Sequence, residues 1–157
     1  MSINEMIYGA VAFAKGLLSW KTAAWSGVAA AGGFLSWLFG GWSTAMMVLL
    51  VCLALDYVTG LIVAGIFHKS PKTANGGLES RAGWKGLLRK VATLLMVALA
   101  HFVDMLLGTV YIRDAVVMAF CVNEILSLLE NFGLMGLPIP KALANAVELL
   151  RKKEETK

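Results

Sequence analysis

The longest uncharged stretch of the chain runs from residue 22 to residue 55 and holds 34 residues. As one α-helix it would measure about 51 Å at roughly 1.5 Å per residue, whereas the hydrocarbon core of a bilayer is about 30 Å thick. A single straight helix would overshoot the membrane, so the stretch predicts two passes. The break falls at Gly40, Gly41, Trp42, Ser43 and Thr44, because paired glycines and small polar residues suit a turn and tryptophan suits the headgroup level.

Composition supports a membrane protein. Hydrophobic residues make up 59% of the chain, against about 45–50% in ordinary soluble domains. The 157 residues hold four spans and a small appendage, with no room left for a soluble enzymatic domain. The net charge of +4 does not indicate nucleic-acid binding, because the basic residues cluster beside apolar spans. Cys52 and Cys121 fall inside apolar segments and read as reduced packing residues.

The sequence therefore predicts an all-α, multi-pass integral membrane protein in three parts. Residues 1–21 form an amphipathic surface helix and not a secretory signal, because Glu5 precedes any lysine. Residues 22–130 form the transmembrane domain, with four spans at about 22–39, 44–67, 91–108 and 115–129 and a basic loop at 68–90. Residues 131–157 form a cytoplasmic amphipathic helix and a charged tail. The apolar stripe of this last helix comprises Ile139, Leu143, Ala146, Val147 and Leu150.

The distribution of lysine and arginine predicts the orientation. The loop at 68–90 holds six basic residues against one acid, Glu79, and the tail after Asn131 holds five more, so both are expected in the cytoplasm. Two cytoplasmic segments must be joined by an even number of crossings, and the third span therefore needs a fourth. Lys15 and Lys21 place the N-terminus inside as well. Thirteen of the fourteen basic residues then face the cytoplasm, and Arg113 sits in an outer turn.

Four ionisable side chains fall inside the predicted spans: Asp56, His101, Asp104 and Glu124. A charge at membrane depth costs about 2.5–3.5 kcal/mol on insertion scales, so such groups face a partner or water. His101 and Asp104 share one helix face and can pair locally. Asp56 and Glu124 have no opposite charge within a helical turn, so they need an inter-helix partner, a bound proton or a wet lumen. Buried interhelical hydrogen bonds and a water-filled path are both open, whereas a metal site lacks ligand spacing.

Small residues recur every four positions in the first two spans, which lets helix backbones approach closely in lipid. The first span also carries a second such stripe at Gly32, Ser36 and Gly40. We expect self-association into homo-oligomers, with helix-packing candidates at Gly27, Ala31, Gly60 and Ala64. No phosphate loop, nucleophile elbow, HExxH or paired-cysteine motif is present, so the sequence predicts no catalytic residue, cofactor or metal.

Five short segments carry a family resemblance: LDYVTG at 55–60, SRAGWKGLLRK at 80–90, IRDA at 112–115, NE at 123–124 and PIPK at 138–141. Through them, residues 46–150 resemble the clostridial-type toxin-secretion and phage-lysis holins. The resemblance implies a non-enzymatic, phage- or prophage-encoded protein of the bacterial cytoplasmic membrane. Such proteins assemble into lesions that let an endolysin or a toxin cross, without required direct contact.

Two alternatives remain beside the holin interpretation. One is a small multi-pass, proton-coupled transporter or exporter that uses Asp56 or Glu124, and the other is a non-conducting membrane scaffold for a partner enzyme. For a holin, we expect Asp56 and Glu124 to face an aqueous lumen or a subunit interface after assembly. Asp56→Asn should then alter or abolish lysis without changing protein abundance. If both Asp56→Asn and Glu124→Gln lyse on the wild-type schedule, the two acids are packing residues.

Overall fold

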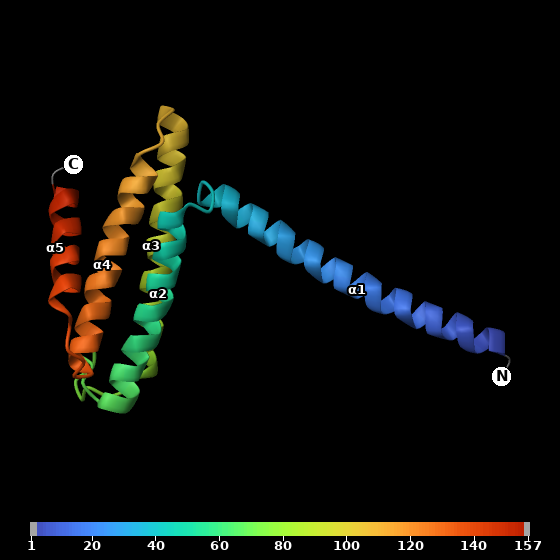
Figure 1. The fold of residues 1–157 in the computed structure, drawn as a ribbon, viewed down its shortest axis with the longest axis horizontal. Helices are drawn as coiled ribbons and strands as arrows, with labels where there is room; N and C mark the ends of the chain where they lie inside the picture. The colour runs from blue at the N-terminus through green and yellow to red at the C-terminus, as the bar shows by residue number, and fades with distance from the viewer. Residues whose placement is uncertain (1–2, 156–157) are drawn as a thin grey trace. The chain divides into compact units, whose positions relative to one another are not determined.

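The structure is a computed structural model that describes residues 3–155, apart from the side chains at 10, 14, 17, 18, 147, 150 and 151–155. Helices are the only regular secondary structure in these residues, as the sequence predicts. In chain order they are α1 (Ile3–Leu38), α2 (Thr44–Ile62), the π-helical turn η1 (Val63–Phe67), α3 (Ser80–Leu107), α4 (Ile112–Leu134) and α5 (Lys141–Glu155) (Figure 1). The chain divides into two compact units, Met1–Gly41 and Trp42–Lys157.

The first unit is the single helix α1. Its 36 residues make it about 54 Å long. The predicted boundary between a surface helix and a first span, at residues 21 and 22, does not interrupt it. The predicted break at residues 40–44 is confirmed: Gly40 and Gly41 adopt φ of 71° and 97°, and the Gly41 N–H donates to the Ser36 carbonyl at 2.7 Å. Glycine suits these left-handed conformations because it has no Cβ to clash.

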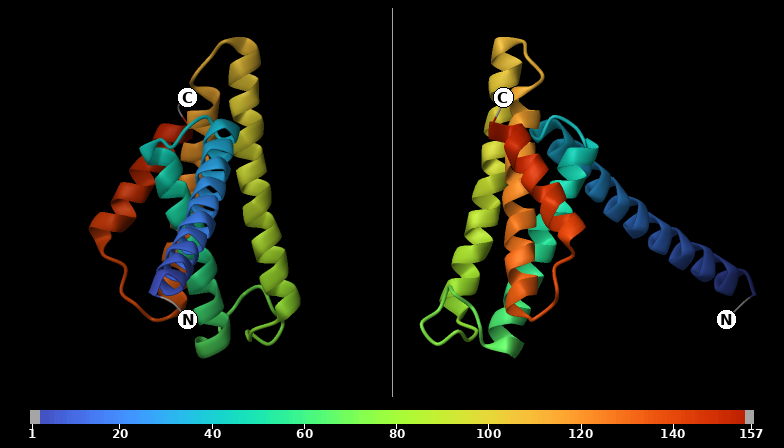
Figure 2. Two further views of the ribbon diagram at one scale, coloured as in Figure 1. Left: turned by 90° about the vertical axis from the view of Figure 1, so that its right-hand side faces the viewer. Right: turned by 60° about the vertical axis from the view of Figure 1, so that its left-hand side comes forward.

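The second unit is a bundle of α2, α3 and α4, with α5 folded back along α4 (Figures 1 and 2). Helices α2 and α3 both pack mainly on α4 and share few contacts with each other. Residues 68–79 connect α2–η1 to α3 at one end of the bundle, here called the loop end, and residues 108–111 connect α3 to α4 at the other, the turn end. Among the largest fully buried side chains, Met46, Leu49, Val97 and Val117 lie between mid-bundle and the turn end, and Val63 lies in η1 near the loop end.

Helix α2 starts at a serine cap and continues into the π-helical turn η1. Ser43 Oγ accepts a hydrogen bond from the Met46 N–H at 3.2 Å, which satisfies one of the free donors at the helix start. The helix runs into η1 and stops at His68, which has a left-handed φ of 51°. The continuous helical segment Thr44–Phe67 has the same limits as the predicted second span.

Helix α3 starts earlier than the sequence suggests. The basic residues of 80–90 predict a loop, but this expectation is wrong, because α3 begins at Ser80 and the loop covers only 68–79. Gly83 and Gly86 face Tyr57 of α2, since a Cβ on either glycine would be in ordinary contact, 3.9 Å, with the tyrosine side chain. The basic side chains are therefore displayed on a helix.

By length and composition, two helices in the described residues are able to cross a membrane, Thr44–Phe67 and Ser80–Leu107. This is fewer than the four spans predicted, so the multi-pass organisation is supported in part. Helix α4 extends beyond the predicted span at 115–129 at both ends and carries Arg113, Asp114, Glu124 and Glu130. The first and fourth spans remain proposals.

Candidate functional site

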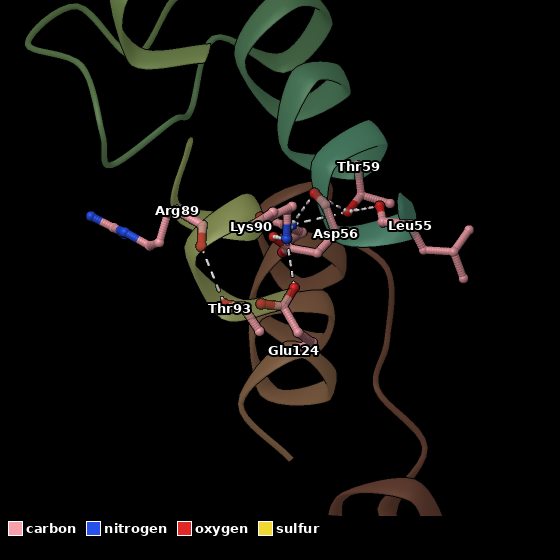
Figure 3. A network of polar contacts seen from close by, with 8 residues as sticks. Leu55, Asp56, Thr59, Arg89, Lys90, Thr93 and Glu124 are labelled. Carbon is pink, nitrogen blue, oxygen red and sulfur yellow. Dashed lines mark hydrogen bonds and ion pairs between the residues drawn. The ribbon is translucent and has the colours of Figure 1, made fainter. Parts of the chain in front are cut away.

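One lysine lies between two carboxylates at the middle of the bundle. Lys90 Nζ donates hydrogen bonds to Asp56 Oδ2 at 2.7 Å and to Glu124 Oε2 at 2.6 Å (Figure 3). The side chains of Lys90, Asp56 and Glu124 are 14%, 8% and 16% exposed. We call these three residues the charge cluster. Each comes from a different helix: α2, α3 and α4 contribute one charge each.

The three charges meet because they lie at the same level of their helices. Asp56 precedes the end of η1 by 11 residues, Lys90 follows the start of α3 by ten, and Glu124 precedes the end of α4 by ten. At roughly 1.5 Å per residue, all three lie about 15–17 Å from the loop end. The charge cluster therefore lies well inside the bundle, at the inner end of the basic first turns of α3, which carry Arg81, Lys85 and Arg89.

Asp56 has a second set of partners on the side of α4. Asn131 Nδ2 donates to Asp56 Oδ1 at 3.0 Å and is also 2.9 Å from Thr59 Oγ1. Thr59 Oγ1 in turn donates to the Leu55 carbonyl at 2.8 Å within α2. The Asp56 carboxylate is therefore held by two helices at once. Buried polar groups with complete partners fix one arrangement of their helices, because any shift leaves a donor or acceptor unpaired.

A cleft with several charged side chains in its wall leads from the loop end to the charge cluster. It has a volume of about 550 Å³ and is lined by loop residues such as Lys72 and Glu79 as well as by all three members of the cluster. Between these limits its wall includes Tyr57, Lys85, Arg89, Ser127 and Glu130. Because the lining reaches from residues of the connecting loop to mid-bundle, the cleft spans the loop-end half of the bundle.

Asp104 belongs to a separate structure at the turn end. Its carboxylate accepts hydrogen bonds from the backbone N–H groups of Ile112 at 3.1 Å and Arg113 at 2.8 Å, and from the Thr109 hydroxyl. These are the free donors at the start of α4, where a negative charge is also favoured by the helix dipole. His101, the partner expected from the sequence, lies one turn earlier on the same face of α3, close enough for an electrostatic interaction with this carboxylate. Asp104 thus joins α3 to α4.

Arg113 completes the turn end. Its guanidinium donates to Ser43 Oγ at 3.0 Å and pairs with Asp114 at 3.2 Å. Ser43 is also the cap of α2, so Arg113 connects the starts of α2 and α4.

The structure brings two of the four predicted intramembrane charges together and places the other two at a different level of the bundle. Asp56 and Glu124 share Lys90, whereas His101 and Asp104 lie toward the turn end. Among the small residues, Gly60 faces Asn131, whose Nδ2 would be 4.0 Å from a Cβ at this position, and Ala64 is buried. A Cβ on Gly27 would have no neighbour within 4 Å among the described residues of the α1 unit.

Lys90 is the functional residue that the sequence did not single out. It ends the run of basic residues after Ser80, and positive charge beside an apolar span favours a loop at the membrane surface. The start of the helix would have indicated its position: because α3 starts at Ser80, Lys90 lies almost three turns inside the helix and not in a loop. Asn131 was likewise placed outside the spans, although it lies within α4.

The arrangement offers no sign of a metal centre. Among the described residues, no group of three or more histidine, cysteine, aspartate or glutamate side chains is placed to hold a metal ion. Cys52 and Cys121 are buried free thiols, in agreement with the prediction that they are reduced packing residues.

Comparison with known proteins identifies the family. The model of the bacteriophage holin family matches residues 33–152. An uncharacterised protein of Listeria monocytogenes is 41% identical over 100 residues, which cover 62% of this chain and 66% of the Listeria protein, just under two thirds of its length. An uncharacterised 14.9 kDa protein of Clostridium perfringens is 34% identical over 154 residues and 97% of both chains.

One relative has a functional name. A protein of Bacillus phage phi105 called a probable holin is 28% identical over 110 residues, which cover 69% of this chain and 76% of the phage protein. No solved structure matches the chain. The family match extends from the end of α1 through α5 and includes every residue of the charge cluster, and this chain therefore belongs to the bacteriophage holin family.

Proposed function

We propose that this protein is a phage holin: it accumulates in the bacterial cytoplasmic membrane, oligomerises and forms lesions that release an endolysin, or export a toxin, and so trigger lysis of the host cell. The family match over residues 33–152 carries the proposal, and the probable holin of phage phi105 supports it. Two long apolar helices fit a role within the membrane.

The surface of the chain supports self-association in a bilayer. Apolar side chains of α3 point outward along its length, among them Leu88, Leu95, Met96, Leu99 and Met105. Lipid or another copy of the chain has to cover such a surface, because water does so only at a free-energy cost. The small-residue stripe of α1 at Gly27 and Ala31 is open and adds a second surface for close helix contact.

The proposed topology keeps both ends in the cytoplasm with four spans. If Thr44–Phe67 and Ser80–Leu107 both cross, the loop between them, which holds Lys69 and Lys72, faces the side favoured for basic residues. Part of α1 and most of α4 then supply the first and fourth spans. With the charge cluster inside the bundle, α4 shields Glu124 from lipid and becomes compatible with the membrane interior.

A second candidate function follows from the cleft. A proton-coupled transporter needs ionisable groups at membrane depth that are reachable from one side, and the charge cluster lies at the inner end of the cleft. The family match makes this the weaker candidate, because it covers residues 33–152 and includes all three charges of the cluster.

Inducible expression in a bacterium separates the candidates. We expect a holin to cause an abrupt loss of viability together with loss of membrane potential, measured by plating and by a potential-sensitive dye. The same plasmid without the start codon of the gene is the control. A change in solute tolerance with intact potential would instead indicate a transporter, and neither effect would indicate a scaffold.

A further inference from the structure

The charge cluster links three helices that otherwise pack against one another to different extents. Helices α2 and α3 make few direct contacts and depend on α4 to hold them together. The ion pair between Lys90 and Asp56 connects α2 to α3 directly, and the pair between Lys90 and Glu124 connects α3 to α4. Lys90 is thus the member of the cluster that pairs with both of the other charges, one on α2 and one on α4.

The cluster also divides the bundle into two different halves. Toward the loop end lies the cleft, whose wall combines charged side chains such as Lys85 and Glu130 with apolar ones such as Leu61. Toward the turn end, the interior is filled by apolar side chains, among them Leu49, Leu53, Val97, Val117 and Val122. In the closed bundle, a cleft with several charged side chains thus ends at the charge cluster, and an apolar packed interior follows beyond it.

These charges restrict the conformations open to the bundle. In the closed form the two carboxylates satisfy Lys90. If the helices separated in lipid, three charges would face hydrocarbon, which is strongly unfavourable. If they separated around water, the same charges would be hydrated. Two states of the bundle therefore keep the three charges away from hydrocarbon: the closed state, in which they pair, and a state open toward water, in which they are hydrated. Intermediate states are unfavourable.

We propose that the Lys90–Asp56–Glu124 cluster is an electrostatic clasp that holds α2, α3 and α4 in the closed bundle, and that its release, with the three charges then facing water, converts the closed form to the lytic form. The inference rests on the proposed holin function and adds a mechanism to it. It assigns Lys90 a positioning role, since the lysine holds the helices in register until the lesion forms.

Charge variants test the clasp. Lys90→Met removes the cation but retains a long flexible stem, and Lys85→Met is the matched control because Lys85 is an exposed lysine of the same helix that also lines the cleft. We expect Lys90→Met, and not Lys85→Met, to lower the thermal unfolding temperature of the full chain in detergent and to move lysis to earlier times. Lys90→Arg should restore both values toward the wild type.

Two results would overturn the proposal. One is a Lys90→Met protein that unfolds and lyses like the wild type. The other is a Lys90→Met protein that inserts, stays folded and no longer lyses, which would make the lysine part of the open form.

A covalent link between α2 and α4 provides a test that does not depend on folding of the Lys90 variants. Thr59 Oγ1 and Asn131 Nδ2 are 2.9 Å apart beside the cluster, so Thr59→Cys with Asn131→Cys places two thiols close together. Cys52 and Cys121 are first replaced by alanine. The full-length protein is reconstituted in phosphatidylglycerol-containing vesicles and either oxidised or linked by a short thiol-specific cross-linker.

We expect the reduced pair to release a trapped dye and the linked pair to lose that release, while each single-cysteine variant is unaffected by the same treatment. Equal release by the linked and reduced proteins would overturn the clasp, since lesions would then form between intact bundles. If even the wild type releases no dye, the holin function itself is contradicted. The comparison of Lys90→Met with Lys85→Met then still decides whether the cluster stabilises the bundle.

Discussion

Lys90 pairs with two acids by virtue of its long, flexible side chain. A lysine stem can lie along apolar surface while its ammonium group reaches a polar partner, and here the ammonium reaches carboxylates on two neighbouring helices. Removing one partner of a buried ion pair typically costs about 3–5 kcal/mol, because the other charge is left uncompensated. A residue that looks like a surface charge in the sequence therefore becomes part of the bundle interior.

Gly76 is the residue on which the loop next to the cleft most depends. It has φ of 66°, and a Cβ at this position would lie 2.2 Å from the His68 carbonyl oxygen. We expect Gly76→Ala to force the loop open and make residues 68–79 more sensitive to protease in inside-out membrane vesicles. Gly77→Ala is the control, since its Cβ would meet only the His68 ring at 3.6 Å. Equal cleavage rates for the two variants would contradict this view of the loop.

At the scale of elements, the most informative difference between sequence and structure concerns where helices start. Charge patterns predicted a surface helix followed by a span at residue 22, but α1 is one helix. They also predicted a loop up to residue 90, but α3 begins at Ser80. In both cases the charged residues mark a change of environment along a helix, and backbone hydrogen bonding continues through it. Turns formed where glycine or proline interrupts the backbone, as at Gly40 and Gly41.

The stripe on α1 gives a prediction about assembly. Gly27→Leu should block close approach of another helix and reduce the yield of cross-linked oligomers in membranes, while insertion persists, because a Cβ at Gly27 meets no other atom within 4 Å among the described residues of the α1 unit. Gly27→Ala is the matched control. An unchanged oligomer ladder for Gly27→Leu would remove the stripe from the assembly. Gly60→Leu is less suitable, since the new side chain would collide with Asn131 inside the bundle at a cost of about 1–3 kcal/mol.

In the bundle of α2, α3 and α4, three sets of polar groups are arranged in order along the bundle axis. Basic side chains surround the loop end, the charge cluster lies at mid-bundle, and Asp104 with Arg113 holds the turn end. This order matches a chain whose loop end faces the cytoplasm.

Cysteine labelling tests the proposed topology. In a background without Cys52 and Cys121, we expect Asn75→Cys to react with a membrane-impermeant thiol reagent only when the reagent reaches the cytoplasmic face. Trp42→Cys and Val110→Cys replace exposed side chains and should react from outside. Labelling of position 75 in intact cells would overturn the orientation derived from the basic residues.

The sequence by itself determined the class of this protein and much of its helical layout. The uncharged stretch and the apolar composition predicted membrane helices, of which Thr44–Phe67 is long and apolar enough to span. The glycine pair predicted the break near residue 41, and the apolar run at 44–67 predicted a helix with those limits. These features are local, because a helix satisfies its own backbone hydrogen bonds and its length is set by the thickness of the bilayer. The resemblance carried by short segments agreed with the family to which the chain belongs.

Only the tertiary structure decided which charges meet. Asp56, Lys90 and Glu124 are each 34 residues from the next, a separation at which sequence spacing carries no information about contact. Their pairing depends on the start of α3, on the common level of three helices, and on the packing of both α2 and α3 against α4. The same packing gave Asp104 its hydrogen-bond partners at the start of α4, because unpaired backbone donors there bind a carboxylate from a neighbouring helix.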